Sequence, residues 1–271
     1  MKKCITALLL LFTLSVTSLL ACTSADKPES ATGKTSKTSK SINDKKTDLT
    51  PVTLNEVAHS IFYAPMYVAM EKNYFEKEGI DLSLVTGFGA DKTMTAVLSG
   101  TADIGFMGSE ASIYTYNEGA RDYVVNFAQL TQRAGNFLVA REDIKNFKWE
   151  DLKGRKVIGG RKGGMPEMVF EYILKQNHID PASDLTIDQN IDFGSTAAAF
   201  AEEKADYDFT VEFEPGATNL EKQEKGYVVA SLGTDSGYVP YTAFSAKKSY
   251  ISQHPEIIQG FTNALQKGMN Y

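Results

Sequence analysis

The chain has 271 residues, 42% of them hydrophobic, enough for one large domain or two smaller ones with separate cores. Its two cysteines, Cys4 and Cys22, both precede residue 23, which excludes a disulfide framework, a Cys-built metal site and a cysteine nucleophile from the rest of the chain. The formal charge is −6, but residues 51–271 carry 20 basic and 30 acidic side chains, and this excess of acid argues against nucleic acid as a partner.

The first 22 residues are typical of an exported protein. Lys2 and Lys3 precede an apolar run over residues 5–20, the order of a secretory signal. The run ends in Leu-Leu-Ala-Cys, which resembles the bacterial lipobox, where the chain is cut before a cysteine that then receives lipid. We therefore predict a signal peptide over residues 1–21 and a lipid anchor at Cys22 on the extracytoplasmic face of a membrane. The alternative is an uncleaved membrane anchor, because about 17–25 apolar residues can span a bilayer.

Residues 22–50 have the composition of a tether. In residues 23–50, 17 of 28 side chains belong to Ser, Thr or Lys, and Ile42 and Leu49 are the only large apolar ones. Such a segment buries too little apolar surface to fold. As a flexible chain its mean reach is about 30 Å.

From residue 51 onward, short β-branched runs alternate with helical periodicity, which predicts an α/β protein. Strands are expected at 52–57, 81–86, 103–107, 123–130, 156–159, 186–191, 207–213, 227–231 and 241–246. Apolar stripes at helical spacing run through residues 66–74, 165–176 and 257–269. Four prolines stand where helices should begin: Pro65, Pro166, Pro215 and Pro255.

A β–loop–α–β unit occurs twice, about a hundred residues apart. Phe88-Gly89 and Ala102-Asp103 in the first copy correspond to Phe193-Gly194 and Ala205-Asp206 in the second. Chance similarity of two common units is the alternative. We predict two similar lobes, the first over residues 51–137 plus 240–271 and the second over 138–236, with hinge crossings at 134–141 and 234–241.

Candidate ligand-binding residues lie in loops that follow the predicted strands, because open parallel sheets bind ligands at the carboxyl ends of their strands. Glycines there let the backbone approach a ligand, hydroxyls form hydrogen bonds and aromatic rings stack. The alternatives are that the aromatics pack beneath the loops, the glutamates cap helices and Arg133 pairs with a glutamate. The candidates are His59, Phe62, Tyr63, Phe88, Gly89, Ser109, Glu110, Arg133, Gly163, Gly164, Phe193, Ser195, Glu212, Glu214 and Tyr238.

No pattern predicts catalysis, a metal site or a cofactor. The glycine-rich run at 159–164 lacks the Gly-Lys-Ser/Thr ending of a phosphate-binding loop, which argues against nucleotide hydrolysis. A Gly-x-Ser-x-Gly nucleophile elbow is also missing. We therefore expect a binding protein rather than an enzyme.

Several short stretches form a recognisable set: His59 and the segments 63–65 (YAP), 74–80 (YFEKEGI), 99–105 (SGTADIG) and 151–157 (DLKGRKV). In these residues the chain, from about residue 52 to the last residue, resembles the solute-binding proteins of ABC importers, in the subgroup that handles nitrate, sulfonates, taurine and pyrimidine precursors of thiamine. The resemblance implies a type II periplasmic-binding fold whose lobes close on a small molecule, and a monomer that delivers this solute to a membrane permease. Relatives usually continue some tens of residues beyond the last helix, so either the sequence is a fragment or terminal helices of lobe one are missing.

The candidate loops favour one class of solute. Carboxylates and aromatic side chains outnumber arginines in them, and these groups suit ring N–H and amino groups better than an anion. We therefore expect a nitrogen heterocycle, such as a pyrimidine precursor of thiamine, with an aliphatic sulfonate, taurine or nitrate as the alternative. Enzymes of pyrimidine synthesis that share this fold carry a cysteine cluster, which residues after Cys22 cannot supply. A ligand-sensing lipoprotein is a further alternative.

Overall fold

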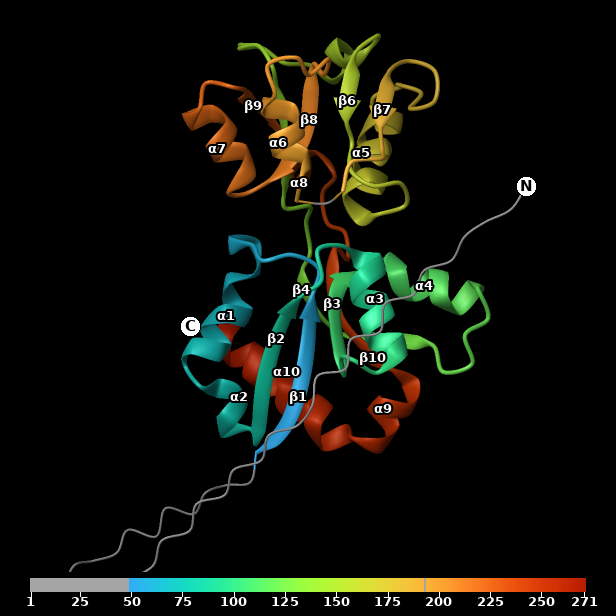
Figure 1. Cartoon of the computed structure of the whole chain (residues 1–271), viewed down its shortest axis with the longest axis vertical. Helices are drawn as coiled ribbons and strands as arrows, with labels where there is room; N and C mark the ends of the chain where they lie inside the picture. Colours follow the sequence, from blue (N-terminus) through green and yellow to red (C-terminus); the bar gives the residue numbers. More distant parts are fainter. Residues whose placement is uncertain (1–48, 193) are drawn as a thin grey trace, which may run out of the picture. The chain divides into compact units, whose positions relative to one another are not determined.

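The structure is a computed structural model that describes residues 49–192 and 194–271. The predicted signal peptide, Cys22, nearly all of the tether and Phe193 lie outside this part of the chain. Within it, ten strands form two five-stranded sheets (Figure 1). No helix among the described residues is both long and apolar enough to cross a bilayer.

The first sheet has the order β2-β1-β3-β10-β4. β1 (Thr50–Glu56), β2 (Ile80–Thr86) and β3 (Ile104–Gly108) are parallel, whereas β10 (Thr242–Lys247) runs antiparallel between β3 and β4 (Val124–Thr131). Together with its helices we call this sheet lobe one. The helices are η1 (Ile61–Tyr63), α1 (Ala64–Glu71), α2 (Tyr74–Lys77), α3 (Ala90–Ser99), α4 (Glu110–Asn117), α9 (Lys248–Gln253) and α10 (Pro255–Met269).

The second sheet has the order β7-β6-β8-β5-β9, and with its helices it forms lobe two. β6 (Lys156–Ile158) is parallel to β7 (Thr186–Asp188) and β8 (Phe209–Phe213), and β5 (Asn136–Ala140) is antiparallel to β8 and β9 (Tyr227–Ser231). The helices are η2 (Trp149–Leu152), α5 (Met165–Gln176), α6 (Thr196–Ala201), α7 (Gly216–Lys222) and α8 (Leu232–Asp235).

The two sheets repeat one topology, with β2-α3-β3 of lobe one matching β7-α6-β8 of lobe two. An aspartate before the third strand of each lobe ties that strand to its neighbour. Asp103 accepts a 2.8 Å hydrogen bond from the Thr53 N–H, and Asp208 accepts one of the same length from the Lys156 N–H. The sequence comparison of the two units matched Asp103 with Asp206. In the structure the counterpart of Asp103 is Asp208.

Most of the segment 134–141, which the sequence predicted as a hinge crossing, is a strand of lobe two. Residues 136–140 form β5, which pairs with β8 on one side and β9 on the other. Residues 136 and 137 consequently belong to lobe two, although the sequence assigned them to lobe one. A strand covered on both faces carries a nearly continuous apolar run and lacks the alternation that reveals other strands.

The chain crosses between the lobes at residues 132–135 and 236–241, and these two segments lie side by side. The Val239 N–H donates to the Gln132 carbonyl at 3.0 Å, and the Tyr241 N–H donates to the Thr131 carbonyl at 3.2 Å. Any hinge motion between the lobes must therefore act on a paired segment.

Candidate functional site

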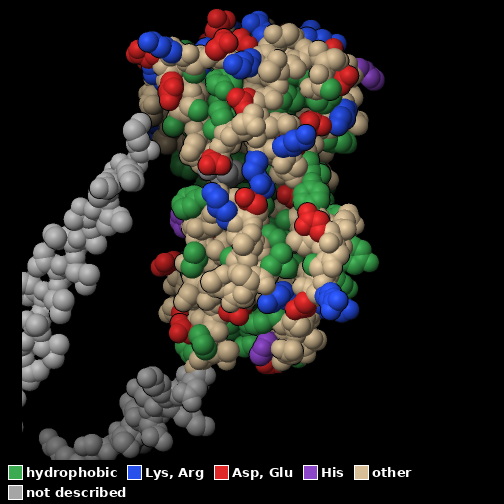
Figure 2. Space-filling model, turned by 45° about the vertical axis from the view of Figure 1, so that its right-hand side comes forward, with side chains coloured by type: hydrophobic (Ala, Val, Ile, Leu, Met, Phe, Trp, Pro, Cys, Tyr) green, Lys and Arg blue, Asp and Glu red, His purple; other side chains and the backbone are tan. Residues whose placement is uncertain are grey.

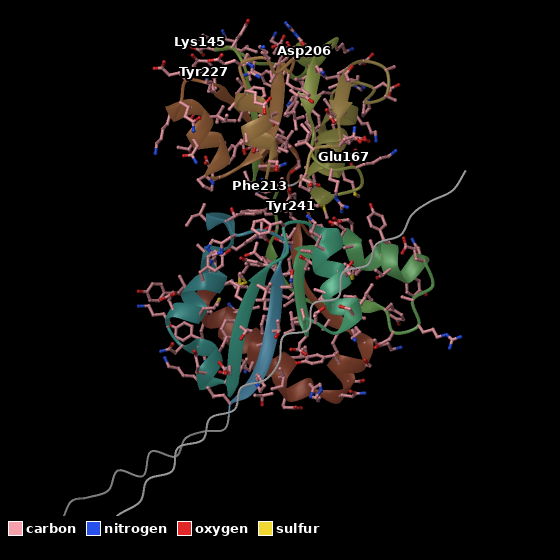
Figure 3. The ribbon with its side chains drawn as sticks, in the orientation of Figure 1. Lys145, Glu167, Asp206, Phe213, Tyr227 and Tyr241 are labelled. Carbon is pink, nitrogen blue, oxygen red and sulfur yellow. The ribbon has the colours of Figure 1, made fainter. Side chains whose placement is uncertain are left out.

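A cavity of about 270 Å³ lies between the lobes, at the ends of the parallel strands. Loops from both lobes line it, as the fold predicts for a ligand site. Figure 3 places Phe213, from β8, and Tyr241, from the return crossing, between the two sheets. Seven of the predicted residues line the cavity: His59, Tyr63, Gly89, Glu110, Gly164, Glu212 and Glu214.

Aromatic rings form one side of this cavity. The Tyr241 ring lies 6.4 Å from that of Phe213 and 5.9 Å from that of Phe62, centroid to centroid. Tyr63 packs edge-on against Phe106 at 4.5 Å. Burial raises the pKa of Tyr63 and of Tyr241, so both phenols stay neutral. A planar apolar solute can stack on such a surface.

Glu110 begins α4 in lobe one, and its carboxyl group is buried with a hydrogen-bond partner for only one of its two oxygens. Oε1 accepts a 3.0 Å hydrogen bond from the Met165 N–H of lobe two, whereas Oε2 is buried without a partner. Burial raises the pKa of Glu110, partly offset by hydrogen bonds from backbone N–H groups and by Arg161. A Cβ at position 108 would lie 2.1 Å from Oε2, so Gly108 makes room for the carboxylate.

Glu212 is the second-last residue of β8 in lobe two and is 5% exposed. Its Oε1 accepts a 2.7 Å hydrogen bond from the Thr210 hydroxyl. Burial raises the pKa of Glu212 to about 7, although hydrogen bonds from Thr210 and Thr196 act in the opposite direction. The group therefore exchanges its proton near neutral pH, inside the cavity.

Arg161 is the one Lys or Arg among the described residues that line the cavity. Its guanidinium lies 3.4 Å from Asp91 Oδ1 of lobe one, and both side chains are about half exposed. The cavity thus holds two buried carboxyl groups and one cation that already has an acidic partner. Its electrostatics favour a solute with hydrogen-bond donors over a simple anion.

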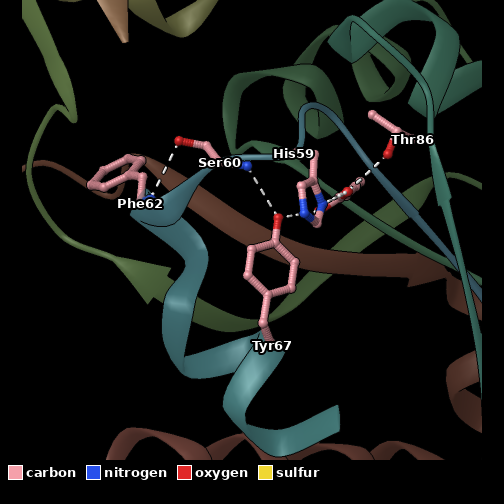
Figure 4. A network of polar contacts seen from close by, with 6 residues as sticks. His59, Ser60, Phe62, Tyr67 and Thr86 are labelled. Carbon is pink, nitrogen blue, oxygen red and sulfur yellow. Dashed lines mark hydrogen bonds and ion pairs between the residues drawn. The ribbon is translucent and has the colours of Figure 1, made fainter. Parts of the chain in front are cut away.

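His59 belongs to a network around the fully buried Glu56 at the end of β1 (Figure 4). Glu56 Oε1 accepts from His59 Nδ1 and from the Thr86 hydroxyl, both at 2.9 Å, and Oε2 accepts from the Tyr67 hydroxyl at 2.7 Å. The Tyr67 oxygen also accepts from the Ser60 N–H. Because its Nδ1 is engaged, His59 can offer only its other nitrogen to a ligand.

Glu214 lines the cavity but caps a helix with its side chain. Its two carboxylate oxygens accept from the Thr218 N–H at 3.1 Å and from the Thr218 hydroxyl at 2.9 Å. Its carbonyl accepts a 3.0 Å hydrogen bond from the Ser60 hydroxyl of the other lobe. The helix-capping alternative therefore accounts for this glutamate.

We expect Glu214→Ala to lower the free energy of unfolding by about 1 kcal/mol, the usual effect of losing a helix cap. Thr218→Ala should have a smaller effect, because it removes only the hydrogen bond from the hydroxyl and keeps the backbone N–H that Glu214 accepts from. Urea denaturation of the two single variants and the double variant tests this. A double variant that loses the full sum of both effects would contradict the pairing.

Seven predicted residues lie outside the cavity lining. Phe62 packs behind it against Phe213 and Tyr241. Phe88 is 58% exposed, and Ser195 stands directly before α6. Gly163 donates its N–H to Glu167 on α5 (Figure 3) and accepts from the Tyr114 hydroxyl. The remaining three are Ser109, Arg133 and Tyr238.

These three residues fasten the crossings between the lobes. The Ser109 hydroxyl donates to the Pro240 carbonyl at 2.6 Å. Arg133 donates to the Gly233 carbonyl at 2.9 Å, and its guanidinium stacks on the Tyr238 ring at 4.2 Å. The expected pairing of Arg133 with a glutamate is replaced by this stacking.

Lining residues absent from the predicted set include Arg161, Tyr241 and Thr242. Arg161 stands in the glycine-rich loop that the sequence marked as unusual. Tyr241 and Thr242 come from the return crossing and the start of β10, and only the pairing of β10 beside β3 brings them to the site. No group of three or more His, Cys, Asp or Glu within the described chain could hold a metal ion.

The lobes touch each other around the cavity. The hydrogen bonds from Ser60 to Glu214 and from Met165 to Glu110 cross the boundary, as do the Arg161–Asp91 ion pair and a 3.0 Å hydrogen bond from Tyr114 to the Gly163 carbonyl. Figure 2 shows basic and acidic side chains on both sides of this boundary. The arrangement is that of a closed cleft.

Residues 61–271 match the family described as NMT1/THI5 like. The chain belongs to this family. It is 51% identical over 223 residues to a Bacillus subtilis (strain 168) protein named "Putative binding protein YtlA", covering 82% of this chain and 66% of that protein. It is 28% identical over 128 residues to a Schizosaccharomyces pombe 4-amino-5-hydroxymethyl-2-methylpyrimidine phosphate synthase, covering 46% of this chain and 35% of the enzyme.

Solved structures show how this member of the NMT1/THI5-like family folds. It superposes on the periplasmic aliphatic sulphonate binding protein SsuA of Escherichia coli with a TM-score of 0.65 and 19% identity, covering 80% of this chain and 72% of SsuA. For the periplasmic nitrate-binding protein NrtA of Synechocystis PCC 6803 the TM-score is 0.65 with 17% identity, covering 83% of this chain and 62% of NrtA. The predicted α/β periplasmic-binding fold is confirmed.

Proposed function

We propose that this chain is the extracytoplasmic solute-binding protein of an ABC importer, anchored through lipid at Cys22 and active as a monomer. The lobes close on a small organic solute and present it to a membrane permease, without covalent chemistry. Support comes from the family, from the relative named as a binding protein and from the cavity between two touching lobes. The solute favours the closed form, because only in that form does it contact both lobes.

We base the proposed class of solute on the two buried carboxyl groups that line one cavity. Glu110 and Glu212 are each 5% exposed and approach the cavity from opposite lobes. A nitrate or sulfonate would place a further negative charge beside them. An amino-substituted nitrogen heterocycle instead offers N–H donors to carboxyl oxygens and a flat ring to the aromatic wall.

The raised pKa of Glu212 suits a ring that carries an amino group beside a ring nitrogen. A neutral carboxylic acid donates its O–H to the ring nitrogen while its carbonyl oxygen accepts from the amino group, so the two groups form parallel hydrogen bonds. A cavity of about 270 Å³ suits one substituted ring. We therefore propose an aminopyrimidine of the kind that precedes thiamine.

Isothermal titration at pH 6 tests this proposal with 4-amino-5-hydroxymethyl-2-methylpyrimidine, taurine and nitrate. Of these three solutes, we expect only the aminopyrimidine to bind. The same pyrimidine without its amino group is the matched control and should bind at least about tenfold more weakly, because a hydrogen bond to a carboxyl group is lost. Tight binding of taurine together with no binding of the aminopyrimidine would overturn this choice of solute.

A further inference from the structure

We propose that Glu110 couples occupancy of the cavity to closure of the lobes, with one carboxylate oxygen bound to the opposite lobe and the other reserved for the solute. The part that concerns the solute rests on the proposed function. The part that concerns closure rests only on contacts between the lobes.

The first half of the coupling is a hydrogen bond across the cleft. Glu110 stands at the start of α4 in lobe one, and Met165 is the first residue of the twelve-residue α5 in lobe two. The first N–H groups of a helix have no partner within it, and the helix dipole favours a negative charge there. The 3.0 Å bond from Met165 N–H to Oε1 exists only while the lobes are together.

The second half is the unpartnered oxygen. Oε2 of Glu110 is buried without a hydrogen-bond donor, in a side chain that belongs to the cavity lining. In an open cleft this oxygen would be hydrated. Closure without a solute removes its hydrogen bonds to water, and no donor of the protein replaces them. A buried acceptor without a partner is unfavourable, whereas a donor from the solute satisfies it. Glu110 therefore disfavours closure of the empty protein and favours closure of the liganded one.

Two other contacts across the cleft lack this double character. Arg161 and Asp91 are both about half exposed, and ion pairs of this kind contribute little. Ser60 is buried and bonded to the Glu214 carbonyl, but it leaves no unpartnered atom at the cavity. Gly108 adds a constraint specific to Glu110, because any side chain there would push Oε2 from its place.

The test measures the distance between the lobes by pulsed electron spin resonance. Spin labels are placed on the exposed residues Glu118, after α4, and Gln176, at the end of α5, in the full chain with Cys4 and Cys22 replaced by serine. The distance distribution gives the ratio of closed to open protein at pH 7, with and without saturating 4-amino-5-hydroxymethyl-2-methylpyrimidine. Glu110→Gln removes the charge but keeps an acceptor for the Met165 N–H. Glu76→Gln, in the first turn of α2, is the matched control.

Without ligand, Glu110→Gln should raise the ratio of closed to open protein at least about fivefold, because a neutral amide is easier to bury than a carboxylate. The additional closure caused by ligand should shrink by at least the same factor. Glu76→Gln should change neither quantity. An unchanged ratio without ligand refutes the closure half of the proposal, and an unchanged response to ligand refutes the coupling.

A second variant approaches the same bond from lobe two. Met165→Pro removes the N–H at the first position of α5, where proline is tolerated. It leaves Oε1 unpartnered as well, so the ratio of closed to open protein should fall, opposite in sign to the effect of Glu110→Gln. A ratio that stays the same or rises refutes the proposed bond. If the wild-type protein binds no aminopyrimidine, the choice of solute fails, while the ligand-free measurements still decide the role of Glu110.

Discussion

Replacing Glu212 by glutamine should abolish the pH dependence of aminopyrimidine binding that we expect for the wild-type protein. Burial raises the pKa of Glu212 to about 7. Whether the shared proton sits on the acid or on the ring nitrogen, the complex holds one proton more than the separated partners above that pH. The wild-type association constant should therefore fall up to about tenfold per pH unit, and about 50-fold between pH 7 and pH 9.

The glutamine variant keeps both hydrogen bonds without titrating. Its N–H donates to the ring nitrogen and its carbonyl accepts from the amino group, so binding should be nearly constant from pH 6 to pH 9. Isothermal titration across this range measures both proteins. The other titratable or charged groups lining the cavity are His59, Tyr63, Glu110, Arg161, Glu214 and Tyr241, and they are the same in both. Equal pH profiles for the two proteins would show that Glu212 is not the group responsible.

The raised pKa of Glu212 also predicts how the stability of the ligand-free protein depends on pH. A carboxyl group with a folded-state pKa above its unfolded value contributes stability that is fully present below about pH 4.5 and is lost as pH rises through about 7. The free energy of unfolding that is lost over this pH range is on the order of 3 kcal/mol. Urea denaturation from pH 5 to pH 8 should show this loss in the wild-type protein and a smaller one in Glu212→Gln.

Truncation of Phe106 to alanine should destabilise the protein by about 3–5 kcal/mol, the range for large aromatic side chains deleted from a core. Phe106 is fully buried in β3, where its ring stacks on Phe244 at 4.2 Å. The Phe106 ring also lies 4.5 Å from the ring of Tyr63, centroid to centroid, and Tyr63 lines the cavity. The variant therefore also removes a ring that supports the aromatic side of the cavity. We expect weaker aminopyrimidine binding as well as lower stability.

Urea denaturation and isothermal titration measure these two effects separately. Tyr116→Ala is the matched control, because Tyr116 is an aromatic residue of the same lobe that is 61% exposed. It should change the free energy of unfolding by no more than about 0.5 kcal/mol. A loss below about 1 kcal/mol for Phe106→Ala would mean that lobe one repacks around the missing ring.

Features that depend on a local pattern were predictable from the sequence. Each of the nine expected strands has a counterpart, and the stripe at 257–269 forms α10 with Pro255 as its first residue. The stripe at 66–74 is split, because α1 ends at Glu71 and Asn73, with φ of 52°, precedes α2. Nothing in the spacing of the apolar residues reveals such a break, since both helices keep the same face toward the core.

The candidate site was predictable to the extent that it is built from strand ends. Glu110 follows β3, and Glu212 is the second-last residue of β8. Strand ends of this kind are where an open sheet binds ligands. Whether a loop residue faces the cavity or fastens the crossings depends on tertiary contacts. Arg133 and Tyr238 are a hundred residues apart, and their stacking is visible only once the two crossings lie side by side. Tyr241 is missed for the same reason.

The position of β10 has a consequence for the order in which the lobes can form. Lobe two is continuous in sequence, so its sheet can assemble from neighbouring segments. In lobe one, the Thr131 and Thr242 side chains that meet at the start of β10 are 111 residues apart. Until β10 arrives, β3 and β4 each present an unpaired edge, and closing so long a loop is entropically unfavourable. During synthesis, lobe one must therefore wait for a strand that follows the whole of lobe two.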